Sequence, residues 1–102
     1  MPHHWRHFWG PAATGRYNFH WDRIRHDSFV VVTAAEGPGF DRQPAPQRFR
    51  GNAMFEVASV APYDGGVAFW VLILDLFRVW PERLNLWTDI TVFDPEDDWG
   101  QN

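Results

Sequence analysis

Apolar and polar residues alternate along several stretches of the chain, which is the pattern of strands with one buried face. Successive side chains of a strand point to opposite faces of a sheet, so the alternation predicts half-buried strands. It occurs over residues 17–21, 48–61 and 84–94. Residues 28–35 (SFVVVTAA) are apolar or β-branched on both faces and predict a central strand.

Glycine and proline separate these stretches. Residues 36–47 carry two glycines and three prolines and predict the longest loop, and APYDGG at 61–66 predicts a turn. Residues 1–16 predict an irregular arm or a short edge strand, and residues 95–102 an acidic tail. The whole chain, 1–102, is therefore expected to form a single all-β domain. Its expected architecture is an antiparallel β-sandwich or flattened barrel of about five to seven strands.

The stretch GGVAFWVLILDLFRVWP, residues 65–81, is apolar almost throughout but contains the carboxylate of Asp75. Turn signals on both sides, many valines and aromatic residues, and no capping residue before Val67 favour a strand over a helix. The stretch is too short and too charged to span a membrane. A strand over 67–80 is long enough to bend, and a bulge near Asp75 is expected.

Strand register can be predicted by asking which pairing gathers the apolar residues on one face. A three-residue loop at 81–83 would pair the strand over 67–80 with the strand over 84–94. A four-residue loop at 62–65 would pair it with the strand over 52–61. The predicted core face then consists of Ala53, Phe55, Val57, Leu72, Leu74, Leu76, Leu86, Ile90 and Val92. The predicted opposite face contains Glu56, Asp75, Phe77, Trp87 and Asp89, with Asp75 directly opposite Asp89.

Carboxylates that face one another across a sheet repel, so this second face needs compensation. A structural explanation is an ion pair with Arg23, Arg25, Arg48 or Arg50, or a register shifted by two residues. The functional interpretation is that Glu56, Asp75, Phe77, Trp87 and Asp89 bind a hydroxylated ligand such as a carbohydrate. Alternatively, Asp75 and Asp89 form an acid–base pair of a small enzyme with His20 as a helper. Calcium bound by these carboxylates, or by residues 94–98, is a further alternative.

Composition narrows the classes of function. The chain is 45% hydrophobic with seven tryptophans, which is typical of a globular protein with an aromatic-rich core. A net charge of -4 argues against nucleic-acid binding, because phosphate recognition needs a basic surface. The absence of cysteine excludes disulfides, thiol catalysis and cysteine-ligated zinc. No cofactor, leader peptide or membrane span is expected, and a cytoplasmic location is the default.

The two terminal segments offer weaker signals. His3 and His7 have the i, i+4 spacing of a zinc half-site on a helix, but no further ligands accompany them, so an exposed arm is favoured. Trp5, Trp9 and Trp99 lie in polar terminal segments, where exposed aromatic rings indicate an interface or a ligand-binding surface. The leading hypothesis is a non-enzymatic module for a small polar ligand. The alternatives are the carboxylate enzyme and a protein that self-assembles through its Trp-rich ends.

Overall fold

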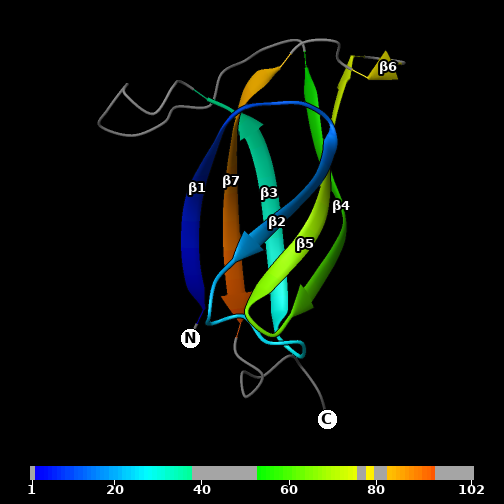
Figure 1. The fold of residues 1–102 in the computed structure, drawn as a ribbon. Coiled ribbons are helices and arrows are strands. Elements are labelled where there is room, and N and C mark those ends of the chain that lie inside the picture. Colours follow the sequence, from blue (N-terminus) through cyan, green and yellow to red (C-terminus); the bar gives the residue numbers. More distant parts are fainter. Residues whose placement is uncertain (1, 38–52, 76–77, 80–82, 94–102) are drawn as a thin grey trace.

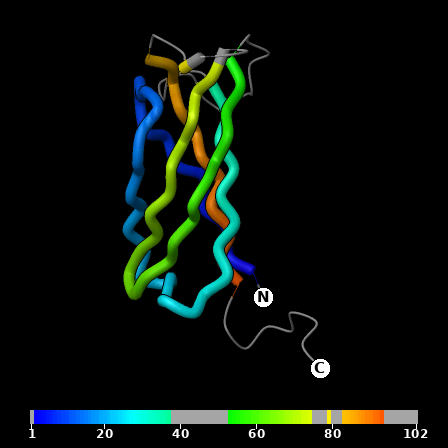
Figure 2. The backbone as a smooth tube through the Cα atoms, turned by 90° about the vertical axis from the view of Figure 1, so that its right-hand side faces the viewer, coloured from blue at the N-terminus to red at the C-terminus, as the bar shows by residue number. Residues whose placement is uncertain are grey.

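Two antiparallel sheets pack face to face in the computed structural model, which describes residues 2–37, 53–75, 78–79 and 83–93 (Figure 1). Sheet A has the strand order β1-β7-β3, and sheet B has the order β2-β5-β4, with β6 added to β5. The strands are β1 (His3–Ala12), β2 (Gly15–His20), β3 (Phe29–Glu36), β4 (Met54–Tyr63), β5 (Gly66–Asp75), β6 (Arg78–Val79) and β7 (Leu84–Phe93). Figure 2 shows sheet B in front of β3 and β7. The all-β sandwich predicted from the sequence is confirmed.

The hydrophobic core lies between the central strands of the two sheets. On β7, alternate residues are fully buried, as predicted for Leu86, Ile90 and Val92. On β5 the prediction of the core face was wrong. The buried residues are Val67, Phe69, Val71 and Ile73, each 0% exposed, whereas Leu72 and Leu74 lie half-buried on the outer face.

The inverted face of β5 follows from the β4–β5 hairpin. Its turn contains only Asp64 and Gly65, because Tyr63 pairs with Gly66, so the predicted four-residue loop was wrong. A bulge at Ser59, whose φ is 55°, then shifts the register once more. Phe55 consequently pairs with Ile73 on the core side. A shift of one residue exchanges the faces of a strand, which explains why the core takes the odd-numbered residues of β5.

The predicted pairing of 67–80 with 84–94 was also wrong. β5 ends at Asp75, and the chain returns as β6, in which Arg78 pairs with Asp75 and Val79 with Leu74. β7 lies in the other sheet, between β1 and β3. Asp75 and Asp89 therefore do not oppose each other in one sheet, because each central strand has its own neighbours on both sides.

The N-terminal segment is an ordered edge strand and not an irregular arm. β1 pairs with β7 along its whole length. A bulge between Phe8 and Gly10, with Gly10 at a φ of 83°, adds Trp9 as an extra residue. This irregularity lets both Trp9 and the buried Ala12 face the core. The predicted loop at 36–47 and the acidic tail lie outside the described residues, apart from the end of β3 and Gly37.

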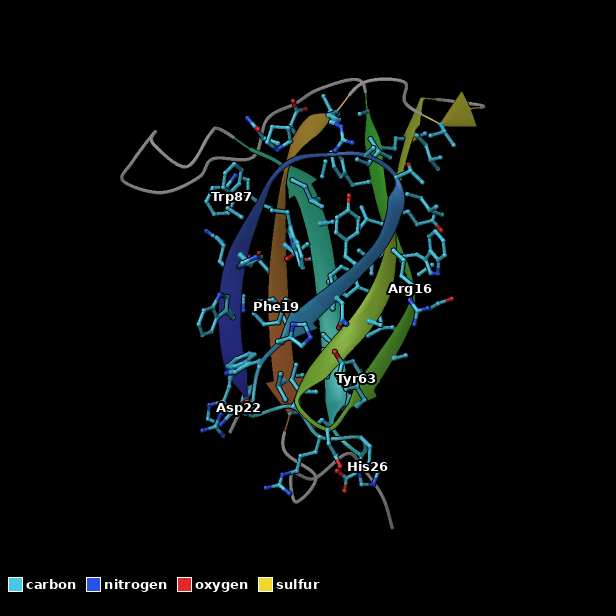
Figure 3. The ribbon with its side chains drawn as sticks, viewed as in Figure 1. Arg16, Phe19, Asp22, His26, Tyr63 and Trp87 are labelled. Carbon is cyan, nitrogen blue, oxygen red and sulfur yellow. The ribbon has the colours of Figure 1, made fainter. Side chains whose placement is uncertain are left out.

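Residues 21–28 cross from sheet B to sheet A and form hydrogen bonds with the β4–β5 turn. The Trp21 amide donates to the Gly65 carbonyl at 2.9 Å, and the Gly65 amide donates to the Ile24 carbonyl at 2.8 Å. Asp64 Oδ1 accepts from the His26 amide at 2.8 Å and lies 2.9 Å from His26 Nδ1. Figure 3 shows His26 at this end of the molecule. These bonds connect the two sheets at one end of the sandwich.

The His26–Asp64 contact predicts a pH-dependent stability. The hydrogen bond and charge of Asp64 raise the pKa of His26, and the His26 amide and ring lower the pKa of Asp64. The contribution of His26 to the free energy of unfolding is complete below its ordinary pKa of about 6.5. It is lost as pH rises through the raised pKa of His26 in the folded protein. The contribution of Asp64 to the free energy of unfolding is complete above its ordinary pKa of about 4. It is lost as pH falls through the lowered pKa of Asp64 in the folded protein.

We therefore expect the stability difference between wild type and His26→Ala to be largest near pH 5 and smaller at pH 8. Both side chains are exposed, so the difference is small at every pH. Urea unfolding at the two pH values measures it. An equal difference at pH 5 and pH 8 would contradict the ionic contribution of His26.

Candidate ligand-binding face

The outer face of sheet A brings polar and aromatic side chains together on three strands. We call it the sheet A face, and its central row comes from the outward residues of β7. The pairing with β1 and β3 places the flanking residues in register. The face consists of His4, Arg6 and Phe8 on β1, of Trp87, Asp89, Thr91 and Phe93 on β7, and of Phe29, Val31 and Thr33 on β3.

An ion pair lies at the centre of the sheet A face. Arg6 Nε donates to Asp89 Oδ1 at 2.7 Å, and Arg6 Nη2 donates to Asp89 Oδ2 at 3.4 Å. The hydrogen bond and the charge of Asp89 raise the pKa of Arg6. The Asp89 side chain is only 14% exposed, whereas that of Arg6 is 45% exposed. The guanidinium is thus held by a carboxylate while much of its surface still meets solvent.

Hydroxyl and imidazole groups extend this polar centre along β1 and β7. His4 Nδ1 lies 3.2 Å from Thr91 Oγ1, and His4 Nε2 lies 3.8 Å from Asp89 Oδ1. Thr33 of β3 pairs with Asp89 on the other side and is exposed. The centre therefore offers hydrogen-bond donors and acceptors side by side.

Aromatic pairs lie at both ends of the polar centre. The rings of Phe8 and Trp87 are 4.6 Å apart between centroids and inclined by 32°. At the other end, the rings of Phe29 and Phe93 are 5.8 Å apart, and Phe29 is 52% exposed. The sheet A face thus alternates flat apolar surfaces with a charged, hydrogen-bonding centre.

The residues predicted as one site are divided between the two sheets. Trp87 and Asp89 lie on the sheet A face, as neighbours on the same side of β7. Glu56 is exposed on β4 in sheet B. Asp75 ends β5 in sheet B, and Phe77 lies outside the described residues. The structure therefore brings together two of the five predicted ligand-binding residues.

The predicted helper, His20, is exposed on β2 and pairs with Gly66 of sheet B, so it does not lie in the sheet of Asp89. His3 and His7 share one side of a strand and not of a helix, which places them about 13 Å apart. His7 packs against Trp9 and Phe19, and partial burial lowers its pKa. Within the described ranges no cluster of three or more histidines or carboxylates could hold a metal ion.

The tryptophans expected at an interface have different environments. Trp9 contacts the core rings, and its Nε1 donates to Thr88 Oγ1 at 2.8 Å. Trp5 is 46% exposed and packs edge-on against Phe19 and Trp21. Trp99 lies outside the described residues. No helix in the described part of the chain has the length and hydropathy needed to cross a membrane.

Two residues of the polar centre, His4 and Arg6 of β1, were not predicted as site residues from the sequence. Residues 3–9 are large on both faces of β1, so hydrophobic alternation does not indicate a strand there. The even-numbered residues of this segment do contain its arginine and a histidine. Their place beside Asp89 and Thr91 can be recognised only when the pairing of β1 with β7 is known.

Comparison with known proteins does not add to this geometry. No family model, curated protein or solved structure gives a significant match to the chain. A functional assignment therefore depends on the chemistry of the faces themselves.

Proposed function

We propose that this protein is a non-enzymatic binding module that holds a small polar ligand, with carbohydrate as the candidate class, on the sheet A face. The observation that carries the proposal is the position of the Arg6–Asp89 ion pair next to the Phe8–Trp87 ring pair on one sheet surface. Neighbouring side chains on one face of a strand are about 7 Å apart, which is close to the width of one sugar ring.

The chemistry of the two pairs is complementary to a sugar. Vicinal hydroxyls can accept from a guanidinium and donate to a carboxylate, and bonds to charged groups are stronger than neutral ones. The apolar C–H face of a sugar ring packs on an aromatic ring, which supplies flat, rigid surface. Ligand sites generally combine such apolar surface with a few fixed polar groups.

The acid–base alternative has less support, because its two carboxylates belong to different sheets. The self-assembly alternative retains Trp5, which is half exposed, whereas Trp9 contributes to the core. A binding face needs neither a proton-sharing carboxylate pair nor a terminal interface, so we favour it over both.

Isothermal titration calorimetry with a panel of neutral, amino and acidic sugars tests the proposal. We expect saturable binding of at least one class, with a loss of affinity of about tenfold or more in Trp87→Ala and in Asp89→Asn, which corresponds to about 1.4 kcal/mol. The control is Trp70→Thr, which removes an exposed tryptophan from sheet B and is expected to bind like wild type.

Circular dichroism and the unfolding midpoint verify that each variant is folded. No binding by any sugar in the panel would contradict the proposal. Binding that is unchanged in both folded variants, Trp87→Ala and Asp89→Asn, would contradict it as well.

A further inference from the structure

The outer face of sheet B is apolar at the end of β5 that is far from the β4–β5 turn. Cross-strand pairing places Met54 and Val79 on either side of Leu74, and Ala58 beside Trp70. Met54 is 48%, Trp70 44% and Val79 54% exposed, whereas Leu72 and Leu74 are half-buried. We call this surface the sheet B patch; it consists of Met54, Ala58, Trp70, Leu72, Leu74 and Val79.

The opposite end of the same face is covered by the protein's own side chains. The Tyr63 hydroxyl donates to Asn18 Oδ1, so the tyrosine crosses the central strand to reach β2. The position of Gly66 beneath it leaves no space for a side chain. The chain thus covers one end of the face with a hydrogen-bonded ring and leaves the sheet B patch with large exposed apolar groups.

Opposite charges lie on the two sides of the sheet B patch. Arg16 of β2 pairs with Trp70, and Glu56 of β4 pairs with Leu72. Both side chains are exposed. They are on opposite edges of the central strand and about 7 Å apart along it. The patch therefore has a positive side and a negative side.

We propose that the sheet B patch packs against the same patch of a second copy, related by a twofold axis parallel to β5. Two sheets that pack face to face keep their strands nearly aligned. An axis along the central strand lays β2 of each copy over β4 of the other. Arg16 of each copy then faces Glu56 of the other, and Trp70 packs beside its symmetry mate. An isologous contact must be self-complementary, and this charge arrangement meets that condition.

The size of the patch sets the expected strength of the contact. Three strands about 4.8 Å apart and about seven residues in length cover roughly 350 Å² in projection. Even with surface relief, the area buried by two copies stays near or below about 1,000 Å², which is the range of weak, transient interfaces. We expect a reversible dimer with a dissociation constant of roughly 10–100 µM.

Sedimentation equilibrium over 5 µM to about 1 mM protein tests this proposal. Wild type is expected to shift with concentration from its chain mass of 12.0 kDa towards twice that mass. Arg16→Glu places two carboxylates opposite each other, and Glu56→Arg places two guanidiniums opposite each other, so each variant is expected to dissociate at least tenfold more readily. The double variant R16E/E56R exchanges the charges and is expected to dimerise like wild type.

Mixing the two single variants provides a second test of the geometry. In a mixed pair, both edge contacts join opposite charges, so the mixture is expected to associate at least tenfold more tightly than either variant alone. Trp70→Thr, which keeps a good strand residue, is expected to weaken the dimer at least tenfold. The matched control is Val31→Thr on sheet A, where the replaced side chain is 40% exposed and association is expected to be unchanged.

A mass that stays at one chain over the whole concentration range would overturn the proposal. So would association that resists both charge reversals. Association lost in Trp5→Ala but kept in Arg16→Glu would place the contact at the N-terminal strand and would equally overturn it. The sugar-binding proposal is unaffected by these outcomes, because it concerns the opposite side of the molecule, as the positions of Arg16 and Trp87 in Figure 3 show.

Discussion

Replacing Trp9 by alanine is expected to lower the free energy of unfolding by about 3–5 kcal/mol, the usual cost of removing a large aromatic side chain from a core. The Trp9 ring lies between the two sheets and contacts rings of both β2 and β5. The centroid distances are 5.2 Å to Tyr17, 6.3 Å to Phe19 and 6.1 Å to Phe69. Urea unfolding followed by circular dichroism measures the loss.

Trp5→Ala is the matched control, because it removes the same side chain from the same strand. Trp5 is 46% exposed and contacts the rings of Phe19 and Trp21. Less apolar area is lost there, so a cost of about 1–2 kcal/mol is expected. Equal costs for the two substitutions would contradict a larger contribution of Trp9 than of Trp5 to the contact between the sheets.

The hydrogen bond of Trp9 can be separated from its packing by a double-mutant cycle with Thr88. Thr88 is 1% exposed and accepts from Trp9 Nε1. Trp9→Phe leaves the threonine hydroxyl without this donor, and Thr88→Val leaves the indole N–H without this acceptor. Each single variant is expected to lose about 1–3 kcal/mol, and the double variant less than the sum of the two.

The strands of this fold could be predicted from the sequence where one face is polar. β7 carries Asn85, Asp89 and Thr91 on one face and Leu86, Ile90 and Val92 on the other, so both its existence and its buried face follow from the pattern. β5 is apolar at every position from Val67 to Leu74, so its pattern predicts a strand but does not select the buried face. A turn shorter by two residues and a bulge decided the face instead.

The candidate site was predictable only in part, because it depends on pairing between the two ends of the chain. Trp87 and Asp89 are adjacent on one face of β7, and alternation alone places them together. Arg6 joins them through a ladder between β1 and β7, which no local pattern specifies. Asp75 was assigned to the same face by assuming that strands consecutive in sequence pair. In this sandwich consecutive strands belong to different sheets at that point.

Gly66→Ala is expected to destabilise the protein by about 1–3 kcal/mol, although it adds only one methyl group. Gly66 begins β5 between His20 of β2 and Tyr63 of β4. A Cβ atom there would lie 2.5 Å from Tyr63 Oη and 2.8 Å from the Phe19 carbonyl oxygen. Both distances are well inside van der Waals contact. Thermal unfolding of the variant measures the cost.

Gly65 provides the comparison, because an added Cβ would meet nothing within 4 Å, and the cost there would come from its φ of 98°. The two contacts at Gly66 can be separated with Tyr63→Ala as the background. Removing the ring relieves the contact with Oη, but the Phe19 carbonyl belongs to the backbone of β2 and cannot move without disturbing the ladder with Val67. Gly66→Ala is therefore expected to remain destabilising in that background, at a lower cost than in wild type. If the cost disappeared there, the tyrosine ring alone would be the reason for glycine at this position, and the close approach of β2 would not restrict it.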